Sequence, residues 1–474
     1  MSCRRLVGID LGIASAHAVR VLDEEGNTLA KRKAVPTVES LSVIELCALE
    51  GAPAGTRLEV VVEPTGPAWL PIAVFFINRG HVVYRVSSAE SADLRRFLSR
   101  HAKTNGIDAD TLARIPLFHP EGVQPLELPS ADAASLDRRV RAAYRLTRQV
   151  ALHKTRVKAL VRQVMPMSPL PGKITHADLA VLERWADPNM LVRAGRTRIA
   201  AVIVKASNNH SGVERADEWL AAANSAIELY AGHSAVAFAD LAAEIATEVR
   251  LLRAIEHELA AHATERENSY ARVDPDGLAR SLPGISDVGG PVLVAKLGEV
   301  ARFAHAKQVR AFAGLAPRAS ETGDTNRKGQ ALSKAGPSLL RTTFVIAADT
   351  ARKQDPQLAR IYYVQMVERG KNHIGALCVV AATLAERAWT VMRRQTPYVI
   401  RDIDGTPVTN EQAAAIIAEH WTVSAEVRAR RRNKKGGKAP QAITTGSRAR
   451  GDLPQTASST CQTPHVNTST RRIA

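Results

Sequence analysis

The chain has 474 residues, of which 45% are hydrophobic and 23% are charged, and its formal net charge is +17. A chain of this length and composition can bury at least one full core, and two or three at the usual domain size, which excludes a short peptide and a wholly disordered protein. The excess of Lys and Arg favours a polyanionic partner, with nucleic acid ahead of a membrane surface. Eleven Lys or Arg and only two acids follow Trp421, so the final segment is the most basic part.

The four cysteines, Cys3, Cys47, Cys378 and Cys461, lie far apart in the sequence. No two of them have the spacing of a metal or redox site, and four are too few to staple a secreted scaffold. At the N-terminus an acid precedes any apolar run of signal length, and no run of about 18 uncharged apolar residues occurs elsewhere. We therefore expect a soluble, unexported protein of a reducing cytoplasm.

The first 130 residues alternate between strand and helix patterns. Apolar and β-branched runs predict strands at 6–11, 16–22, 28–34, 58–62 and 82–86. A turn at 24–27 makes the second and third runs a hairpin, and the apolar segment 69–78 is predicted to be a helix. Three antiparallel strands followed by alternating strands and helices are typical of a ribonuclease-H-like fold, so we predict an α/β domain of this kind at residues 1–130.

Long helices follow this domain. The segments 136–164 and 238–267 carry charged residues between apolar ones without an internal Gly or Pro, which predicts a helical, coiled-coil-like region over 131–275. A third block with further helical patterns predicts a mostly α C-terminal domain over 276–400. Residues 422–474 are rich in Gly, Ser, Thr, Lys and Arg with few aliphatic residues, and are predicted to form a basic disordered tail.

Acidic residues stand on the first predicted strand, after the fourth and at the start of a helix. Asp10 lies on the first strand among apolar neighbours that make the strand central and buried, where an unpaired carboxylate would cost several kcal/mol. Glu63 follows the fourth strand, which lies beside the first in a ribonuclease-H-like sheet, and Asp108 and Asp110 open a helix. Oxygen ligands so arranged suit a pair of Mg²⁺ ions about 3.5 to 4 Å apart for phosphodiester chemistry. Each acid alone could be a turn residue or an ordinary helix cap, but their joint placement favours a metal site.

The C-terminal block contains a Gly-rich turn and a polar, basic loop. The turn at 282–290 includes Gly284 and Gly289 and resembles a helix-hairpin-helix element, whose backbone N–H groups can meet a phosphate. The residues of interest in and beside the following loop are Arg318, Ser320, Thr322, Arg327 and Lys328. A hydroxyl here could attack phosphorus while the cations stabilise the developing charge. A loop that merely binds phosphate backbone is an equally good interpretation.

Together these motifs resemble the insertion-sequence-110 family of transposases. The resemblance runs in order over about residues 5–400 and rests on Gly8-Ile9-Asp10, the segments 61–66 and 103–109, Leu282-Pro283-Gly284-Ile285, Arg302-Phe303 and the segment 313–318. It implies an N-terminal RuvC-like domain whose DEDD tetrad binds Mg²⁺, a helical region, and a C-terminal transposase domain with a serine nucleophile. It also implies DNA recombination through a covalent phosphoserine link, guided by a structured RNA from the element's own end.

The metal tetrad departs from the family pattern at one position. The first acid maps to Asp10 and the Glu to Glu63, but Asn105 stands where the family has its third Asp, three residues before Asp108. An amide oxygen can ligate Mg²⁺ without contributing charge, so either the site has one fewer negative charge or Asp110 substitutes.

The nucleophile also departs from the pattern. The family's Ser falls on Thr322, with Ser320 two residues earlier. The chemistry favours Ser320, because the methyl group of Thr restricts approach, whereas the spacing favours Thr322.

The sequence thus predicts a bacterial DNA transposase or recombinase that cuts and rejoins DNA by Mg²⁺-assisted attack of a Ser or Thr hydroxyl. Its expected partners are DNA, a structured guide RNA and further copies of the chain in a dimer or tetramer. Its expected location is the cytoplasm, at the nucleoid and away from membranes. The alternatives are a Mg²⁺-dependent junction-resolving nuclease that uses water, and a non-enzymatic DNA- or RNA-binding protein whose acids are structural.

Overall fold

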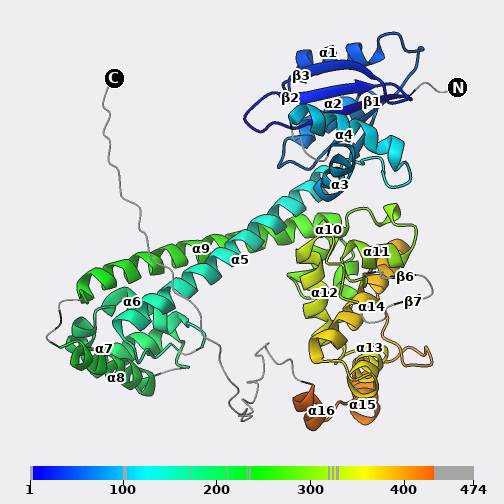
Figure 1. Cartoon of the computed structure of the whole chain (residues 1–474). Coiled ribbons are helices and arrows are strands. Elements are labelled where there is room, and N and C mark those ends of the chain that lie inside the picture. Colours follow the sequence, from blue (N-terminus) through cyan, green and yellow to red (C-terminus); the bar gives the residue numbers. More distant parts are fainter. Residues whose placement is uncertain are drawn as a thin grey trace, which may run out of the picture.

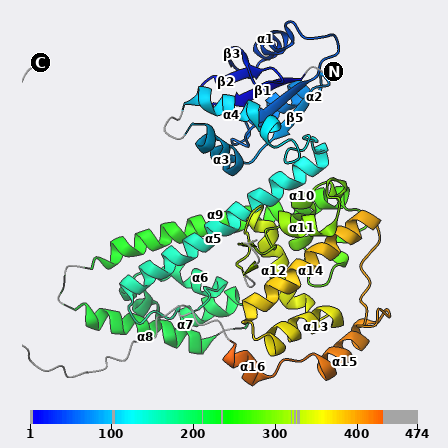
Figure 2. The same cartoon turned by 45° about the vertical axis from the view of Figure 1, so that its right-hand side comes forward.

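A mixed sheet, a pair of long helices and two helical bodies make up the computed structural model (Figure 1). The sheet and the C-terminal body lie at one end of the long helices, and a smaller helical body lies at the other end, in both views (Figures 1 and 2). The structure describes residues 4–99, 104–170, 172–210, 212–231, 233, 236–318, 321–322, 325–326 and 330–431.

The N-terminal sheet has the strand order β3-β2-β1-β4-β5. Its strands are β1 (Arg5–Asp10), β2 (His17–Leu22), β3 (Thr28–Ala34), β4 (Leu58–Val62) and β5 (Val82–Arg85). β2 is antiparallel to β1 and β3, whereas β4 is parallel to β1 and β5. All five strands lie where strand patterns were predicted, and their order is compatible with the predicted ribonuclease-H-like fold.

Helices cover both faces of this sheet. They are α1 (Val38–Leu49), α2 (Trp69–Ile77), α3 (Ser88–Leu98) and α4 (Asn105–Phe118). Side chains alternate between the faces of a strand. Val7 and Ile9 therefore share a core with Ile44 of α1 and Phe76 of α2, while Leu6 packs with Ala113 of α4.

Two long antiparallel helices connect the parts of the molecule. They are α5 (Ala131–Val164) and α9 (Phe238–Val273), of 34 and 36 residues. Ion pairs join them, among them Lys154 with Glu256 at 2.8 Å, and the side chain of His153 contacts Glu248 at 2.5 Å. The helices α6 (His176–Trp185), α7 (Pro188–Ala206) and α8 (Val213–Leu229) pack around the far end of the pair, with Trp219 fully buried in their core. The two predicted long helices are thereby confirmed, and each extends beyond the segment, 136–164 or 238–267, that the sequence predicted.

The C-terminal body is almost wholly helical. Its main helices are α10 (Gly289–Leu297), α11 (Ala306–Phe312), α12 (Ser338–Ala351), α13 (Pro356–Tyr363) and α14 (His373–Arg394). By length and composition, α14 alone among the helices of the described residues could cross a membrane, but its apolar face forms the centre of this body. The core also includes Leu136 and Val140 of α5 and Tyr270 of α9, so the body is built onto one end of the long helices.

Ordered structure reaches further toward the C-terminus than the sequence analysis predicted. The helices α15 (Asn410–His420) and α16 (Ala425–Arg430) follow α14, and Val423 between them is buried in the C-terminal core. Trp421 packs edge-on against Tyr363, with 5.7 Å between ring centroids. The predicted tail therefore starts too early at residue 422, because two apolar residues in a basic segment are enough to hold a short helix on the body. Residues 432–474 lie outside the described residues.

A buried carboxylate network holds α13 and α14 to the segment that follows them. The fully buried side chain of Asp355 caps α13 by accepting a hydrogen bond from the Leu358 N–H at 2.9 Å. It also accepts from the Tyr398 hydroxyl at 2.6 Å and from Arg387 at 3.1 Å. Burial and the neighbouring carboxylate raise the pKa of Tyr398, so that its hydroxyl stays a donor.

Replacement of Asp355 by Ala is expected to lower the free energy of unfolding by about 3 to 5 kcal/mol, because the partly buried Arg387 loses its counter-ion and the Leu358 N–H and Tyr398 hydroxyl lose their acceptor. Denaturant titration measures this change. Asp240→Ala removes an exposed carboxylate in the first turn of α9 and should cost no more than about 0.5 kcal/mol. A similarly small loss in both variants would contradict the assignment of Asp355 as a central stabilising residue.

Candidate active site

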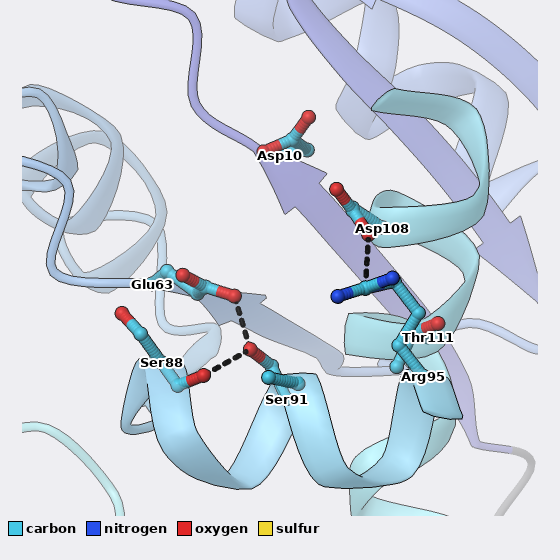
Figure 3. A pocket seen from close by; sticks show the side chains of 8 residues that line it. Asp10, Glu63, Ser88, Ser91, Arg95, Asp108 and Thr111 are labelled. Carbon is cyan, nitrogen blue, oxygen red and sulfur yellow. Dashed lines mark hydrogen bonds and ion pairs between the residues drawn. The ribbon is translucent and has the colours of Figure 1, made fainter. Parts of the chain in front are cut away.

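Three acids predicted from the sequence line one pocket of about 220 Å³. Asp10 comes from the end of β1, Glu63 directly follows β4, and Asp108 lies in the first turn of α4 (Figure 3). We call this the acid pocket; the described residues that line it are Asp10, Glu63, Ser88, Ser91, Ala92, Arg95, Asp108 and Thr111. The structure thus brings together the three carboxylates that are far apart in the sequence.

Strand pairing places the first two acids together. β1 and β4 are adjacent and parallel, with Ile9 opposite Val62, so the residues that follow these positions emerge at the same edge of the sheet. The strands themselves are buried, since Ile9 and Val62 have no exposed surface. This central, fully covered strand pair fixes the position of Asp10 and Glu63.

The third acid depends on a close helix–strand contact. A Cβ at Gly8 would lie 2.0 Å from the carbonyl oxygen of Ala109 and 2.4 Å from the nitrogen of Ala113, so only glycine lets α4 rest on β1 here. The Thr104 side chain caps α4 by accepting from the N–H of Ile107 at 3.2 Å. Asp108 then falls one turn inside the helix, next to the end of β1.

Helix α3 contributes the polar neighbours of the acids. Ser91, which is 6% exposed, donates its hydroxyl to the Glu63 carboxylate, and Arg95 forms an ion pair with Asp108 at 3.1 Å (Figure 3). Sequence analysis missed these residues. The spacing of Ser88, Ser91 and Arg95 by three and four residues places them on one helix face, and that spacing was the available signal.

The donor set of the acid pocket suits a hard divalent cation. Its possible ligands are carboxylate and hydroxyl oxygens, which Mg²⁺ prefers over nitrogen or sulfur. As the side chains stand, no three acidic, His or Cys residues of the described part of the chain are grouped closely enough to hold an ion together. Among the described residues that line the pocket, Arg95 is the only cation, and it offsets part of the negative charge at Asp108.

The two other predicted metal ligands lie elsewhere. Asp110 forms an ion pair with Arg114 at 2.7 Å, one turn further along α4, and does not line the acid pocket. Asn105 lines a second pocket on the other side of the α4 start. Thr111 occupies the position one turn after Asp108 on the pocket side. Neither alternative for the fourth ligand is therefore gathered with the other three.

Two N–H groups of the Gly-rich turn before α10 donate hydrogen bonds within the protein. The Gly284 N–H donates to the side chain of Gln354 at 2.9 Å, and the Gly289 N–H donates to the Ser286 hydroxyl at 3.2 Å. Gly284 packs so tightly on α12 that a Cβ would lie 2.2 Å from the carbonyl oxygen of Ala347. A phosphate contact at these two N–H groups would have to replace bonds that hold the turn, so the glycines are first of all packing residues.

The hydroxyl-rich loop contains a short β-hairpin, and hydrogen bonds hold its two ends together. The strands β6 (Glu321–Thr322) and β7 (Thr325–Asn326) pair, and Pro317 bridges to Leu332 nearer the body. Arg341 of α12 donates to the carbonyl groups of Ala313, Lys334 and Ala335, which ties both ends of the loop together.

The predicted nucleophiles and cations of this loop are described only in part. The backbone of Thr322 forms β6, and Arg318 is exposed with its N–H bonded to the carbonyl of Ala331 at 2.9 Å. Ser320, Arg327 and Lys328 lie outside the described residues. The choice between Ser320 and Thr322 thus stays a prediction.

Two transposase family models match this chain. A DEDD transposase model of the IS110 type matches residues 7–166, and the model of the transposase IS116/IS110/IS902 family matches residues 276–363. The first match contains all three carboxylates of the acid pocket, and the second contains the hairpin.

Relatives from insertion elements are similar over much of the chain. The IS110 uncharacterized 43.6 kDa protein of Streptomyces coelicolor is 24% identical over 73% of this chain and 84% of its own length. The IS116 uncharacterized 44.8 kDa protein of Streptomyces clavuligerus is 24% identical over 82% of this chain and 94% of its own. The IS900 uncharacterized 42 kDa protein of Mycobacterium paratuberculosis is 27% identical over 47% of this chain and 54% of its own.

The acid pocket, the helical C-terminal body and these matches define an insertion-element transposase. Within that class, the chain belongs to the IS110 family, as the sequence motifs indicated.

Arg95→Ala is expected to increase the stabilisation of the protein by Mg²⁺. Without Arg95 the three carboxylates of the acid pocket repel one another more strongly, and a divalent cation no longer competes with a guanidinium. The melting temperature of the Arg95→Ala variant should be lower in EDTA than in millimolar Mg²⁺. This difference should be larger than the same difference for the unsubstituted protein.

Arg96→Ala is the matched control, because Arg96 is the next residue of α3 and its ion-pair partner is the exposed Asp93. The same response to Mg²⁺ in both variants would show that Arg95 does not offset the charge of a cation site.

Proposed function

We propose that this transposase cuts and rejoins DNA at a composite active site made of the acid pocket and the β6–β7 hairpin. The observation that carries the proposal is the gathering of Asp10, Glu63 and Asp108 at the end of two parallel strands. The N-terminal part would be a RuvC-like domain, which its strand order supports.

In this proposal Asp10, Glu63 and Asp108 hold Mg²⁺, which when bound withdraws charge from the scissile phosphate. Ser91 would orient Glu63 through its hydrogen bond, and Arg95 would leave Asp108 on metal binding and become available to the phosphate. A hydroxyl of Ser320 or Thr322 gives up its proton and forms a bond to phosphorus, one ester bond to phosphorus breaks, and the released oxygen takes up a proton. The phosphoester to the protein conserves the broken bond for rejoining without ATP.

The composite site would take its two halves from different copies of the chain. The acid pocket and the hairpin belong to separate parts of the structure, joined through α5 and α9 (Figure 1). A dimer or tetramer can place the hairpin of one copy over the acid pocket of another. Guidance by a structured RNA, in a nucleoid-associated complex in the cytoplasm, is supported by the family resemblance and by the net charge of +17.

Asp10→Asn and Glu63→Gln are each expected to reduce strand breakage by at least about 100-fold, the usual scale for losing a group that stabilises transition-state charge. Binding of DNA and RNA should stay nearly unchanged, because phosphate contacts come from Lys and Arg. The assay is incubation with the element's junction DNA, its transcribed flank and Mg²⁺, followed by denaturing electrophoresis.

Asp110→Asn is the matched control, because it removes an acid from the same helix as Asp108 without touching the acid pocket. It should keep its activity. Full activity of the Asp10 or Glu63 variant would reject the metal assignment, and loss of activity in the Asp110 variant would make Asp110 the fourth ligand.

Ser320→Ala and Thr322→Ala are expected to differ sharply, because only one hydroxyl can stand in line with the leaving oxygen at about 3 to 3.5 Å from phosphorus. One variant should lose the covalent protein–DNA adduct, while the other keeps a substantial fraction of it. Ser333→Ala, at the base of the hairpin, should keep the adduct. Strand breakage without an adduct in the double variant would favour the water-using, junction-resolving nuclease instead.

A further inference from the structure

A second pocket of about 370 Å³ lies on the other side of the α4 start from the acid pocket. Among the described residues, its lining contains three cations and no acid, and we call it the cation pocket. The lining residues are Ser15, Ala16, Ala18, Arg20, Arg32, Lys33, Thr104, Asn105 and Gly106. None of them lines the acid pocket, and the proposed function uses none of the cations.

The strand register makes the two pockets neighbours. Asp10 of β1 stands opposite Ala18 of β2, and Ala18 stands opposite Lys33 of β3. Residues directly opposite each other share a face of the sheet, so these three form one row across three strands. Adjacent strands are about 4.8 Å apart, which places the β3 backbone at Lys33 about 10 Å from that of Asp10. Ala18, between them, lines the cation pocket.

The cations of this pocket have no carboxylate partner among the described side chains. Arg20 donates to the carbonyl group of Val19 at 3.0 Å, and Arg32 donates to that of Lys31 at 3.2 Å. Both bonds go to a neighbouring backbone group and leave the positive charge uncompensated. No ion pair of Lys33 occurs within the described part of the chain either.

Arg20 also stands where a cation is least favoured. Its guanidinium would lie 2.3 Å from a Cβ at Gly106, so it rests directly on the first turn of α4. The N-terminus of a helix carries a partial positive charge and N–H groups without an intrahelical acceptor, which repel a cation and attract an anion. A guanidinium and a helix N-terminus that converge on one open pocket form a favourable arrangement only when an anion lies between them.

We propose that the cation pocket binds a backbone phosphate of the nucleic-acid strand whose neighbouring phosphate enters the acid pocket. The identification of the ligand as a nucleic-acid strand that continues into the acid pocket rests on the proposed function. The affinity of the cation pocket for an anion does not, because it follows from the charges that line the pocket. Arg20 and Lys33 supply the positive charge, and the amide of Asn105 can donate a hydrogen bond to the phosphate. The neutral side chain of Asn105 is compatible with phosphate binding, whereas an aspartate at position 105 would repel the phosphate.

The test measures binding of labelled single-stranded DNA and single-stranded RNA of one sequence to the full chain by fluorescence anisotropy over a range of salt concentrations. All variants carry Asp10→Asn and are measured in EDTA, so that binding is read without strand breakage. Arg20→Gln and Lys33→Gln should each weaken binding and reduce the slope of log K against log salt by about one. Asn105→Asp should weaken binding as well.

Arg57→Gln is the matched control, because Arg57 is an exposed cation just before β4, at the edge of the sheet opposite the acid pocket. It should leave the slope unchanged, and melting temperatures confirm that all variants are folded. The strand, DNA or RNA, whose slope falls in the Arg20 and Lys33 variants is the one that occupies the pocket. If the Arg20 and Lys33 variants have the same slope as the Arg57 variant with both the DNA and the RNA probe, the proposal is overturned.

This outcome is independent of catalysis. If the slopes fall but the unsubstituted chain breaks no strand, the phosphate site stands and the proposed transposase chemistry fails. If strands are broken and the slopes do not fall, the chemistry stands and the cation pocket carries no phosphate.

Discussion

The contact between α4 and β1 at Gly8 is the constraint on which the site depends. With the Ala109 carbonyl oxygen only 2.0 Å from where a Cβ would be, the helix backbone rests directly on the strand. This contact brings the first turn of α4 to the end of β1, beside Asp10. Both pockets are built around that turn, since Asp108 lines the acid pocket, whereas Asn105 and Gly106 line the cation pocket. Any side chain at position 8 would push the helix away and separate the acids.

The turn of α4 also divides the charge of the site. On one side, three carboxylates line the acid pocket, and Arg95 is the one cation among its described lining residues. On the other side, the described lining of the cation pocket has three cations and no carboxylate. Pockets of opposite sign that share one helix turn create a steep local field, which favours a ligand carrying both a cation and an anion. A phosphate strand with its bound divalent ions has that character, so the field itself supports a nucleic-acid strand lying across β1, β2 and β3.

Much of this part was predictable because it follows from local pattern. The five strands were found from β-branched alternation, and the meeting of Asp10 with Glu63 follows from adjacent parallel strands that end at one edge. What could not be predicted depends on long-range packing and helix phase. Ser91 and Arg95 matter only once α3 is docked over the strand ends, and the separation of Asp110 from Asp108 is decided by how α4 is rotated on Gly8. The burial of Val423 likewise needs the finished C-terminal core.

The long helices set the distances at which the parts can cooperate. Helix α5 has 34 residues, which at about 1.5 Å per residue spans about 50 Å. The C-terminal body is fixed to the same end of this helix as the sheet, by the shared core and by the ion pair of Lys296 with Asp137 at 2.5 Å. The body of α6, α7 and α8 is held at the other end (Figures 1 and 2). Because α5 and α9 are joined along their length by ion pairs, they resist bending as a pair. The far core begins at Val157 and the C-terminal core includes Val140, so about 25 Å of helix keeps the two bodies apart.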